Sequence, residues 1–486
     1  MQARSSFPLI AVLALVAALL GFGIVFWINA PRATSFSPSP AAGRVSSLAP
    51  VEITFSQPMD SEITATDLSI KPPHPGRVEW PDAQTLRFVP VGEWPVDTPI
   101  SVTLTSGARS SRGLPLLRAP SWQFQVGAPR VVYLQLEPQG GISNIWSLLL
   151  DGSDARKLTD QPLGVNEFDV TTDGTRIAFS AIREDGGSDL MEIDVESLEI
   201  RSLLACAGES CRSPTYSPNG GWLAFERRIN DDELTGTTVM LLNLDTNEQA
   251  PLPVSSNEVT HTPTWVPTGM ISFINETLRA VGWYDSESGL LDYAPDFAAE
   301  MGAWSPDGLW LVLSEILLQE HTHAEAVATE TPAESVSPAT EATPSPTVGS
   351  AVSEQDVFFT HLLRLNIANR ALVELTDVQL VEDTAPVFSP SGRQLAFGRK
   401  FVDAANWTPG RQLWLMQSDG SAPRQLTDDG LYNHAAFVWS PDEQTLVYMR
   451  FNMADFNAPP EIWAIGADGE NARRLAEGGA LPHWLP

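Results

Sequence analysis

Basic residues are scarce in this chain of 486 residues. It carries 29 Lys and Arg against 60 Asp and Glu, which gives a formal net charge of −31. A surface this acidic repels a phosphate backbone and an anionic membrane face, so the composition argues against a nucleic-acid partner. Calcium and other cationic ligands remain compatible with it, and so does the simpler interpretation that the charge keeps the protein soluble.

Cysteine is almost absent as well. The two cysteines, Cys206 and Cys211, stand in the loop CAGESC, and no CxxC pair or neighbouring histidine supplies the further ligands that a metal site needs. We therefore expect neither a metal nor a cofactor. Outside the cytoplasm these two cysteines are candidates for a disulfide that closes a small loop.

Long apolar runs are limited to one segment. Phe7–Ile28 contains no charged side chain, and at 1.5 Å per residue it spans roughly 33 Å, enough for the core of a bilayer. A cleaved signal peptide is the alternative, although its apolar region is usually shorter and Pro31 directly after Ala30 would hinder cleavage. We predict that residues 1–30 form an uncleaved signal anchor, a single transmembrane helix, with the bulk of the chain at the cell surface or in the periplasm.

The chain after this segment is rich in turns and alternating segments, which predicts an all-β protein. Residues 31–45 are rich in Pro, Ser and Ala and are typical of a spacer. Five segments with apolar residues at every second position follow, which favours a β-sandwich. They are Val51–Phe55, Arg77–Trp80, Thr85–Val89, Ile100–Leu104 and Trp122–Val126.

The motifs in this region resemble a known family. ITFSQPMD at Ile53–Asp60, TLRFVP at Thr85–Pro90 and ISVTLTSGA at Ile100–Ala108 are similar to the SbsA type of bacterial Ig-like domain. The resemblance covers residues 36–127. It implies a β-sandwich that serves as a spacer or stalk on secreted and surface proteins.

From residue 131 onward one unit repeats: an aromatic residue, then Ser-Pro-Asp-Gly, then an apolar strand. A period near 45 residues with about four short strands per unit is typical of propeller blades. The Asp-Gly pair suits a tight hairpin, because Gly tolerates positive φ. The clearest copies are TYSPNG at Thr215–Gly220, TWVPTG at Thr264–Gly269, AWSPDG at Ala303–Gly308, VFSPSG at Val387–Gly392 and VWSPDE at Val438–Glu443.

The two ends of this region complement each other. The first segment, Arg130–Thr159, lacks the aromatic-Ser-Pro strand, whereas Leu481–Pro486 (LPHWLP) looks like that strand alone. If the carboxyl-terminal strand completes the first blade, six full units and one composite unit make seven blades, and no sheet edge is left open. Six blades remain the alternative.

These motifs are similar to the TolB-like family of propellers, whose repeat carries P-x-W-S-P-D-G and ends in R-x-L-T. The resemblance covers residues 130–486, although several copies are eroded and the count of seven differs from the six blades of TolB. One interval between copies is long. It holds residues 321–356, a Pro, Thr, Ser and Ala-rich stretch that we expect to be a disordered insertion.

Catalytic motifs are missing. No G-x-S-x-G elbow, P-loop, HExxH or EF-hand loop occurs, so the sequence favours a binding or scaffold protein for protein or glycan ligands over an enzyme. A propeller-type polysaccharide lyase or glycosidase, which would use scattered residues near the axis, is the alternative.

Ligands of propellers generally meet the loops at one mouth of the central channel. Counting four or five residues back from the aromatic of each motif reaches a polar residue in each blade, Asn166 among them and Thr384 as the alternative to Asp383. Convergent polar groups favour a binding site. The simpler interpretation is that a segment entering an inner strand is exposed and therefore polar. The candidate ligand-binding residues are Arg212, His261, Glu300, Asp383 and His434.

Overall fold

A computed structural model shows the fold, and part of the chain is described in it. The predicted anchor Phe7–Ile28, the predicted insertion 321–356 and Glu300 lie outside the described residues. Within the described part, no helix combines the length and the apolar character that a membrane span requires. The described residues are 30–39, 45–96, 98–105, 107–137, 141–229, 236–295, 301–319, 357–378, 380–403 and 405–486.

The amino-terminal part is a sandwich of two antiparallel sheets. Alternate residues of its strands are buried, which places Trp94 and the apolar face of each strand in one core. A short helix, α2 (Ser61–Thr66), begins where Asp60 accepts a hydrogen bond from the Ile63 backbone N–H at 3.2 Å. One sheet has the order β1 (Ala33–Ser37), β2 (Val51–Phe55), β5 (Thr85–Pro90), β4 (Gly76–Asp82), and the other has β3 (Leu68–Lys71), β6 (Pro99–Leu104), β7 (Ser121–Gln125).

The structure corrects the predicted spacer. Ala33–Ser37, within residues 31–45, is strand β1 and pairs with β2. Phe36 packs against Trp122 with ring centroids 4.6 Å apart. β1 lies at the edge of its sheet, so only one side of its backbone is hydrogen-bonded to another strand. Proline and serine are tolerated there, and for that reason the composition did not predict a strand.

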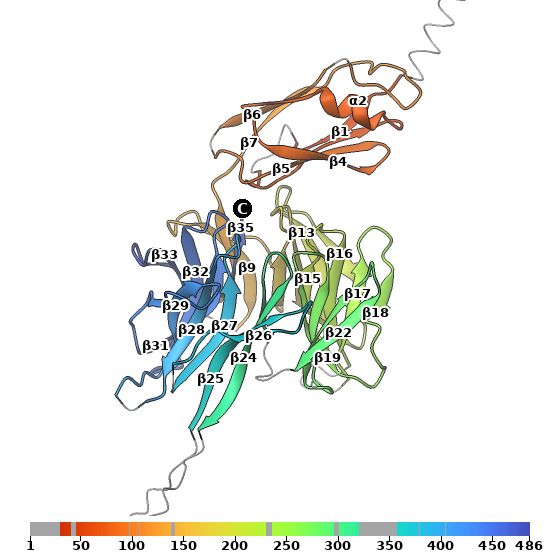
Figure 1. The fold of residues 1–486 in the computed structure, drawn as a ribbon. Coiled ribbons are helices and arrows are strands. Elements are labelled where there is room, and N and C mark those ends of the chain that lie inside the picture. The colour runs from red at the N-terminus through yellow and green to blue at the C-terminus, as the bar shows by residue number, and fades with distance from the viewer. Residues whose placement is uncertain are drawn as a thin grey trace, which may run out of the picture.

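The remaining described strands form a propeller-like fold of four-stranded antiparallel units, numbered here 1 to 7 along the chain (Figure 1). Unit 1 holds β35 (Gly479–Leu485), β8 (Arg130–Leu136), β9 (Ser143–Leu149) and β10 (Arg156–Lys157); unit 2 holds β11 (Val165–Val170), β12 (Arg176–Ile182), β13 (Ser188–Asp194) and β14 (Ile200–Leu204); unit 3 holds β15 (Ser210–Tyr216), β16 (Trp222–Arg228), β17 (Thr238–Asn243) and β18 (Gln249–Pro251). Unit 4 holds β19 (Thr260–Trp265), β20 (Ile271–Asn275), β21 (Ala280–Asp285) and β22 (Leu290–Pro295); unit 5 holds β23 (Ala303–Trp304), β24 (Trp310–Gln319), β25 (Val357–Asn366) and β26 (Leu372–Glu374). Unit 6 holds β27 (Val381–Phe388), β28 (Gln394–Phe401), β29 (Gln412–Gln417) and β30 (Arg424–Gln425); unit 7 holds β31 (Tyr432–Trp439), β32 (Thr445–Asn452), β33 (Glu461–Gly466) and β34 (Arg473–Glu477).

The carboxyl-terminal strand joins the two ends of this region. β35 pairs antiparallel with β8, so that Trp484 lies opposite Val131 and Leu485 opposite Arg130. Apolar side chains fill the space between consecutive units, and one such cluster joins Val447 of unit 7 to Tyr133 of unit 1. The units thus bury their faces against each other, because a single four-stranded sheet cannot cover both of its own faces.

The Ser-Pro-Asp-Gly motif forms the turn from the first to the second strand of a unit. In unit 5 the Ser305 hydroxyl donates to Asp307 Oδ1 at 2.5 Å and accepts from the Trp310 backbone N–H at 3.0 Å. Gly308 has a φ of +67°, which a side chain would strain. The motif therefore recurs because each of its residues closes the same turn.

These turns lie at the end of the propeller that faces the Ig-like domain (Figure 1). The turn glycine of unit 2, Gly174, lies beside Ser46 of the Ig-like domain and beside Pro486. Burial, and then the charge of Asp442 in the turn of unit 7, raises the pKa of Glu93 in the Ig-like domain. The Ig-like domain is therefore positioned over units 1, 2 and 7.

Candidate functional site

The predicted ligand-binding residues lie on the first strands of their units. These strands contact each other from one unit to the next, for example β11 with β15 and β27 with β31, so they form the innermost layer of the fold. Arg212 is on β15, His261 on β19, Asp383 on β27 and His434 on β31. Glu300 lies outside the described residues.

A bulge in each of these strands separates the predicted residues into two sets. Arg212 and His261 directly precede the bulge residue, whereas Asp383 and His434 stand two residues before it. Neighbouring residues of a strand face opposite sides, so the two sets point in opposite directions. Counting four or five residues back from the aromatic residue could not separate the two sets, because the fourth and the fifth positions lie on opposite faces of the strand. The bulge residues have positive φ and are Ser213, Thr262, Ala385 and Ala436.

Asp383 is sealed inside unit 6. Its side chain has no solvent exposure, and Arg399 on β28 binds both carboxylate oxygens, with Nε–Oδ1 and Nη2–Oδ2 distances of 2.7 Å. Arg399 is itself only 3% exposed and lies over the rings of Phe397 and Trp414. The predicted ligand contact Asp383 therefore lies in a buried ion pair with Arg399.

His434 is also buried. Its Nδ1 donates to the backbone carbonyl of Arg411 at 2.8 Å, and its ring tilts against that of Tyr448 at 5.4 Å. Burial lowers the pKa of His434 to about 4. The imidazole is thus neutral at physiological pH and binds the backbone just before β29 of unit 6, so the predicted ligand contact falls on a buried side chain.

Arg212 and His261 each lie beside a carboxylate. Arg212 Nη2 lies 2.8 Å from Glu167 Oε1 of unit 2, and both side chains are partly exposed. His261 Nδ1 is hydrogen-bonded to the Thr262 hydroxyl at 2.9 Å, while its Nε2 lies 3.6 Å from Glu276 Oε2. Among the four predicted residues that the structure describes, Asp383 and His434 are thus enclosed by protein contacts, whereas Arg212 and His261 lie beside Glu167 and Glu276.

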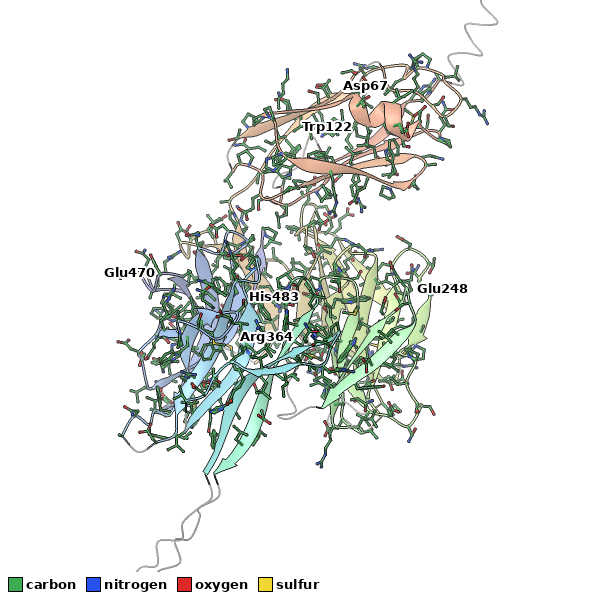
Figure 2. The ribbon with its side chains drawn as sticks, in the orientation of Figure 1. Asp67, Trp122, Glu248, Arg364, Glu470 and His483 are labelled. Atoms are coloured by element: carbon green, nitrogen blue, oxygen red, sulfur yellow. A yellow bond between two sulfur atoms is a disulfide. The ribbon has the colours of Figure 1, made fainter. Side chains whose placement is uncertain are left out.

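A second pair of ionisable side chains meets where the ring closes. His483 on β35, labelled in Figure 2, places Nδ1 3.7 Å from Asp169 Oδ1 of unit 2. Asp169 Oδ2 accepts from the Tyr216 backbone N–H at 2.7 Å, and the His483 ring packs against Phe168. Because these contacts join units 1, 2 and 3, the pair stabilises the closure. Across the described part of the chain, no three His, Cys, Asp or Glu side chains are grouped to hold a metal ion.

Cys206 and Cys211 are joined by a disulfide with a Cα–Cα distance of 6.1 Å. It closes the loop between β14 and β15 and packs in the apolar cluster between units 2 and 3. Its place is structural, since the loop it closes leads directly into the first strand of unit 3.

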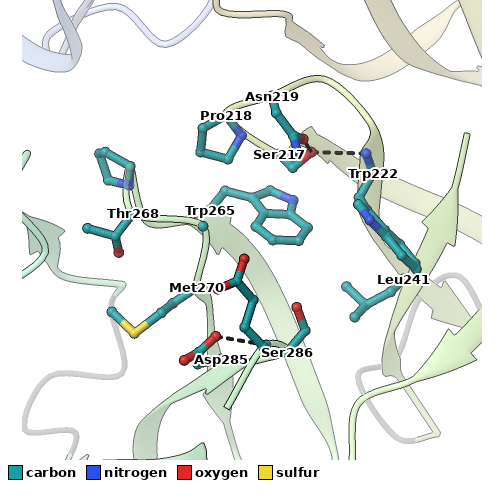
Figure 3. Close-up of a pocket in the computed structure, with 13 residues that line it drawn as sticks. Ser217, Pro218, Asn219, Trp222, Leu241, Trp265, Thr268, Met270, Asp285 and Ser286 are labelled. Carbon is teal, nitrogen blue, oxygen red and sulfur yellow. Dashed lines mark hydrogen bonds between the residues drawn. The ribbon is translucent and has the colours of Figure 1, made fainter. Parts of the chain in front are cut away.

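The feature that the sequence did not predict is a groove between units 3 and 4, at the turn end of the fold (Figure 3). It encloses a cavity of about 500 Å³. Figure 3 shows the Trp265 ring between the Ser217–Asn219 turn and the Asp285–Ser286 loop, with Trp222 and Leu241 on one side. The lining residues are Ser217, Pro218, Asn219, Trp222, Leu241, Trp265, Pro267, Thr268, Gly269, Met270, Asp285, Ser286 and Glu287.

The two tryptophans of this groove are positioned by backbone contacts. The Trp265 indole N–H donates to the backbone carbonyl of Thr215 at 3.1 Å, which orients its ring. The Ser217 hydroxyl accepts from the Trp222 backbone N–H at 2.9 Å, and the Trp222 side chain is 36% exposed. A large apolar side chain this exposed beside a concave surface often marks a binding site.

The rim of the groove is acidic. Asp285 accepts hydrogen bonds from the Ser288 hydroxyl and from the Glu287 backbone N–H, and these two bonds lower its pKa. Glu287 is exposed beside it. The groove therefore combines aromatic faces with negative charge, which suits a cation or a polar ligand with an apolar face.

A signal for this groove exists in the sequence. Trp222 occupies the first position of the second strand, where unit 5 also carries a tryptophan, Trp310, and other copies carry Arg176, Gln394 and Thr445. An aromatic side chain at a position with no common requirement indicates a local role.

Among the comparisons with known proteins, a family model matches the amino-terminal part of the chain. Residues 28–126 match the family model described as a bacterial Ig-like domain. No curated protein matches the chain.

Three solved structures are among the chains similar to this one. TolB from Acinetobacter baumannii is 11% identical, with 86% of this chain and 83% of that chain covered and a TM-score of 0.43. The β-propeller domain of the Trilobed protease from Pyrococcus furiosus is 10% identical, with 79% and 93% covered and a TM-score of 0.45. An oligogalacturonate lyase from Vibrio parahaemolyticus is 14% identical, with 64% and 73% covered and a TM-score of 0.39.

Proposed function

We propose that this chain is a membrane-anchored, extracytoplasmic binding protein that presents a seven-bladed propeller on an Ig-like stalk of the SbsA type. The ligand binds without turnover in the groove between units 3 and 4. The observation that carries this proposal is the open pair of tryptophans, Trp222 and Trp265, beside the carboxylates of Asp285 and Glu287.

The ring supports binding because it presents this surface already formed. The indole of Trp265 and the backbone of Trp222 are held by hydrogen bonds within the protein. The groove lies between two units whose shared core is closed by buried side chains of both, such as Leu241 and Phe273. A preformed site avoids the entropy cost of ordering loops around a ligand.

The anchor and the location follow from the sequence. Phe7–Ile28 is apolar over a length of roughly 33 Å, which is enough to cross a bilayer. Bacterial Ig-like domains and propellers are typical of exported proteins. Protease treatment of intact cells should therefore degrade or release the part after residue 30, while a cytoplasmic control protein stays intact. Protection of this part until the cells are lysed would refute the orientation.

The binding site is tested by capturing partners with the full-length protein in mild detergent. We expect Trp222→Ala to lose capture and Trp407→Ala to retain it. Trp407 is the matched control, because it is 57% exposed but lies outside the groove. Equal capture by both variants would refute the groove as the site. Release of products when the protein is incubated with polysaccharides would refute binding without turnover and favour the lyase or glycosidase alternative.

A further inference from the structure

The repeat supplies an internal comparison for the groove. An equivalent groove of about 420 Å³ lies between units 5 and 6. Strand pairing defines the matching positions: Leu241 pairs with Ala224 in unit 3, and Arg364 pairs with Val312 at the same place in unit 5. By the same register, Trp310 of unit 5 matches Trp222.

In this second groove the protein supplies its own cation. The Arg364 guanidinium carbon lies 4.2 Å from the centre of the Trp310 ring, and Nη1 donates to the Ser418 backbone carbonyl of unit 6 at 2.8 Å (Figure 2). The pKa of Asp419 is lowered, mainly by hydrogen bonds from Ser421 and additionally by the charge of Arg364. An arginine thus stacks on the aromatic wall, reaches the next unit and lies near a carboxylate.

At the corresponding place between units 2 and 3, an arginine makes related contacts. The Arg176 guanidinium carbon lies 5.3 Å from the centre of the Tyr216 ring, and Tyr216 holds the position that Trp265 has in unit 4. Arg176 Nη2 donates to the Gly220 backbone carbonyl at 2.7 Å. Two equivalent places between units therefore hold a guanidinium over an aromatic ring with a hydrogen bond to the neighbouring unit.

The groove between units 3 and 4 has the aromatic rings and carboxylates, but no arginine of the described lining lies over them. None of the described residues that line it is Lys or Arg, since Leu241 stands where Arg364 does and Trp222 where Arg176 does. Its carboxylates remain: Glu287 matches Asp419 in the register, and Asp285 adds a second acidic side chain.

We propose that this groove accepts the side chain of an arginine from a partner polypeptide, which stacks on Trp222 and Trp265 and pairs with Asp285 and Glu287. The inference rests on the proposed binding function and names its ligand chemistry. A guanidinium is planar and weakly hydrated, so it stacks on an indole more readily than an ammonium does. The chain's net charge of −31 favours a cationic partner over a neutral glycan.

The test uses the full-length protein labelled with 5-fluorotryptophan and observed by fluorine NMR. Substitutions Trp222→Phe, Trp265→Phe and Trp310→Phe assign the three resonances. The probe is a capped Gly-Arg-Gly peptide, and the control is the same peptide with citrulline, which has a similar shape without the charge. We expect the arginine peptide to shift the Trp222 and Trp265 resonances until saturation. We expect the citrulline peptide to leave both resonances unchanged.

Three variants sharpen the comparison. Leu241→Arg copies the arrangement of units 5 and 6 and should abolish the response. Asp285→Asn combined with Glu287→Gln should weaken binding by about three- to tenfold. Arg364→Ala empties the second groove, so the arginine peptide should then shift the Trp310 resonance, which it leaves unchanged in the native protein. This gain of response tests the proposal even if Leu241→Arg does not fold.

The outcomes are distinguishable. Equal shifts with arginine and citrulline peptides would overturn the cationic ligand. A neutral oligosaccharide that shifts the same resonances while the arginine peptide does not would replace it with a glycan. If the arginine peptide has no effect but Trp222→Ala still abolishes partner capture, the proposed function stands and only the arginine is wrong. If Trp222→Ala also leaves capture unchanged, both proposals fail.

Discussion

The buried ion pair between Asp383 and Arg399 gives a sharp test of the register of unit 6. Neither side chain is exposed beyond 3%, and two hydrogen bonds of 2.7 Å join them. Asp383→Ala leaves the guanidinium buried and uncompensated, so we expect the free energy of unfolding to fall by about 3–5 kcal/mol. Arg399→Ala should cost a similar amount.

The double variant Asp383→Leu with Arg399→Met should recover most of this loss. It removes both charges together and fills the space with apolar groups, and such replacements of buried pairs are often neutral or stabilising. The four proteins form a double-mutant cycle, measured by urea unfolding followed by near-ultraviolet circular dichroism. We expect a coupling free energy of about 3 kcal/mol or more. Glu382→Ala is the matched control, since this neighbour is partly exposed and should cost under about 1 kcal/mol.

One result would show that Asp383 does not sit in this buried pair. If Asp383→Ala lowers stability by less than about 1 kcal/mol and abolishes partner capture, Asp383 faces a ligand, as the sequence predicted. The bulge at Ala385 would then be one residue out of register, and the reasoning that separates Asp383 from Arg212 would be wrong.

Three further predictions concern the ring, a buried histidine and the disulfide. Deleting Leu481–Pro486 removes the buried Leu485 and bares the edge of β8, so stability should fall by about 5 kcal/mol; an unchanged melting temperature would contradict closure. Burial lowers the pKa of His434 from 6.5 to about 4, so the unfolded chain gains a proton first as pH falls from 6.5 to 4. Over that window the free energy of unfolding of the native protein should fall by about 3 kcal/mol relative to that of His434→Asn, measured by urea unfolding across pH. Parallel pH profiles of the two proteins would refute this. Replacing Cys206 and Cys211 by Ala should cost about 2 kcal/mol, judged from the entropy of so short a loop; thermal melting that matches the native protein would contradict it.

Much of the secondary structure was predictable because its causes are local. The Ser305–Gly308 turn closes through the hydroxyl of Ser305 and the carboxylate of Asp307, which are two residues apart in the sequence. The predicted strands Val51–Phe55 and Ile100–Leu104 are confirmed, because alternation of apolar residues is itself the signature of a half-buried strand. The pairing of β35 with β8 was also predictable, since one end lacks the motif that the other end carries.

The candidate site could not be predicted in the same way. The sequence shows which residues are polar, but a bulge of one residue decides which face of an inner strand they occupy, and so Arg212 and Asp383 separate. The partner of Asp383 is Arg399 on the adjacent strand, and no spacing rule distinguishes that pairing from an open site. The groove at Trp222 is formed by two units at once, so neither repeat reveals it alone.

The sequence by itself determined the repeat, its turns and the strand that joins the two ends, because these depend on residues close in the chain and on one complementary pair of ends. The tertiary structure alone decided which equivalent grooves are occupied. That outcome depends on whether the side chain opposite the tryptophan is Arg364 or Leu241, and therefore on contacts between strands far apart in the chain. The position of a residue within a repeat can be read from nearby sequence, whereas the filling of a groove depends on side chains from several strands.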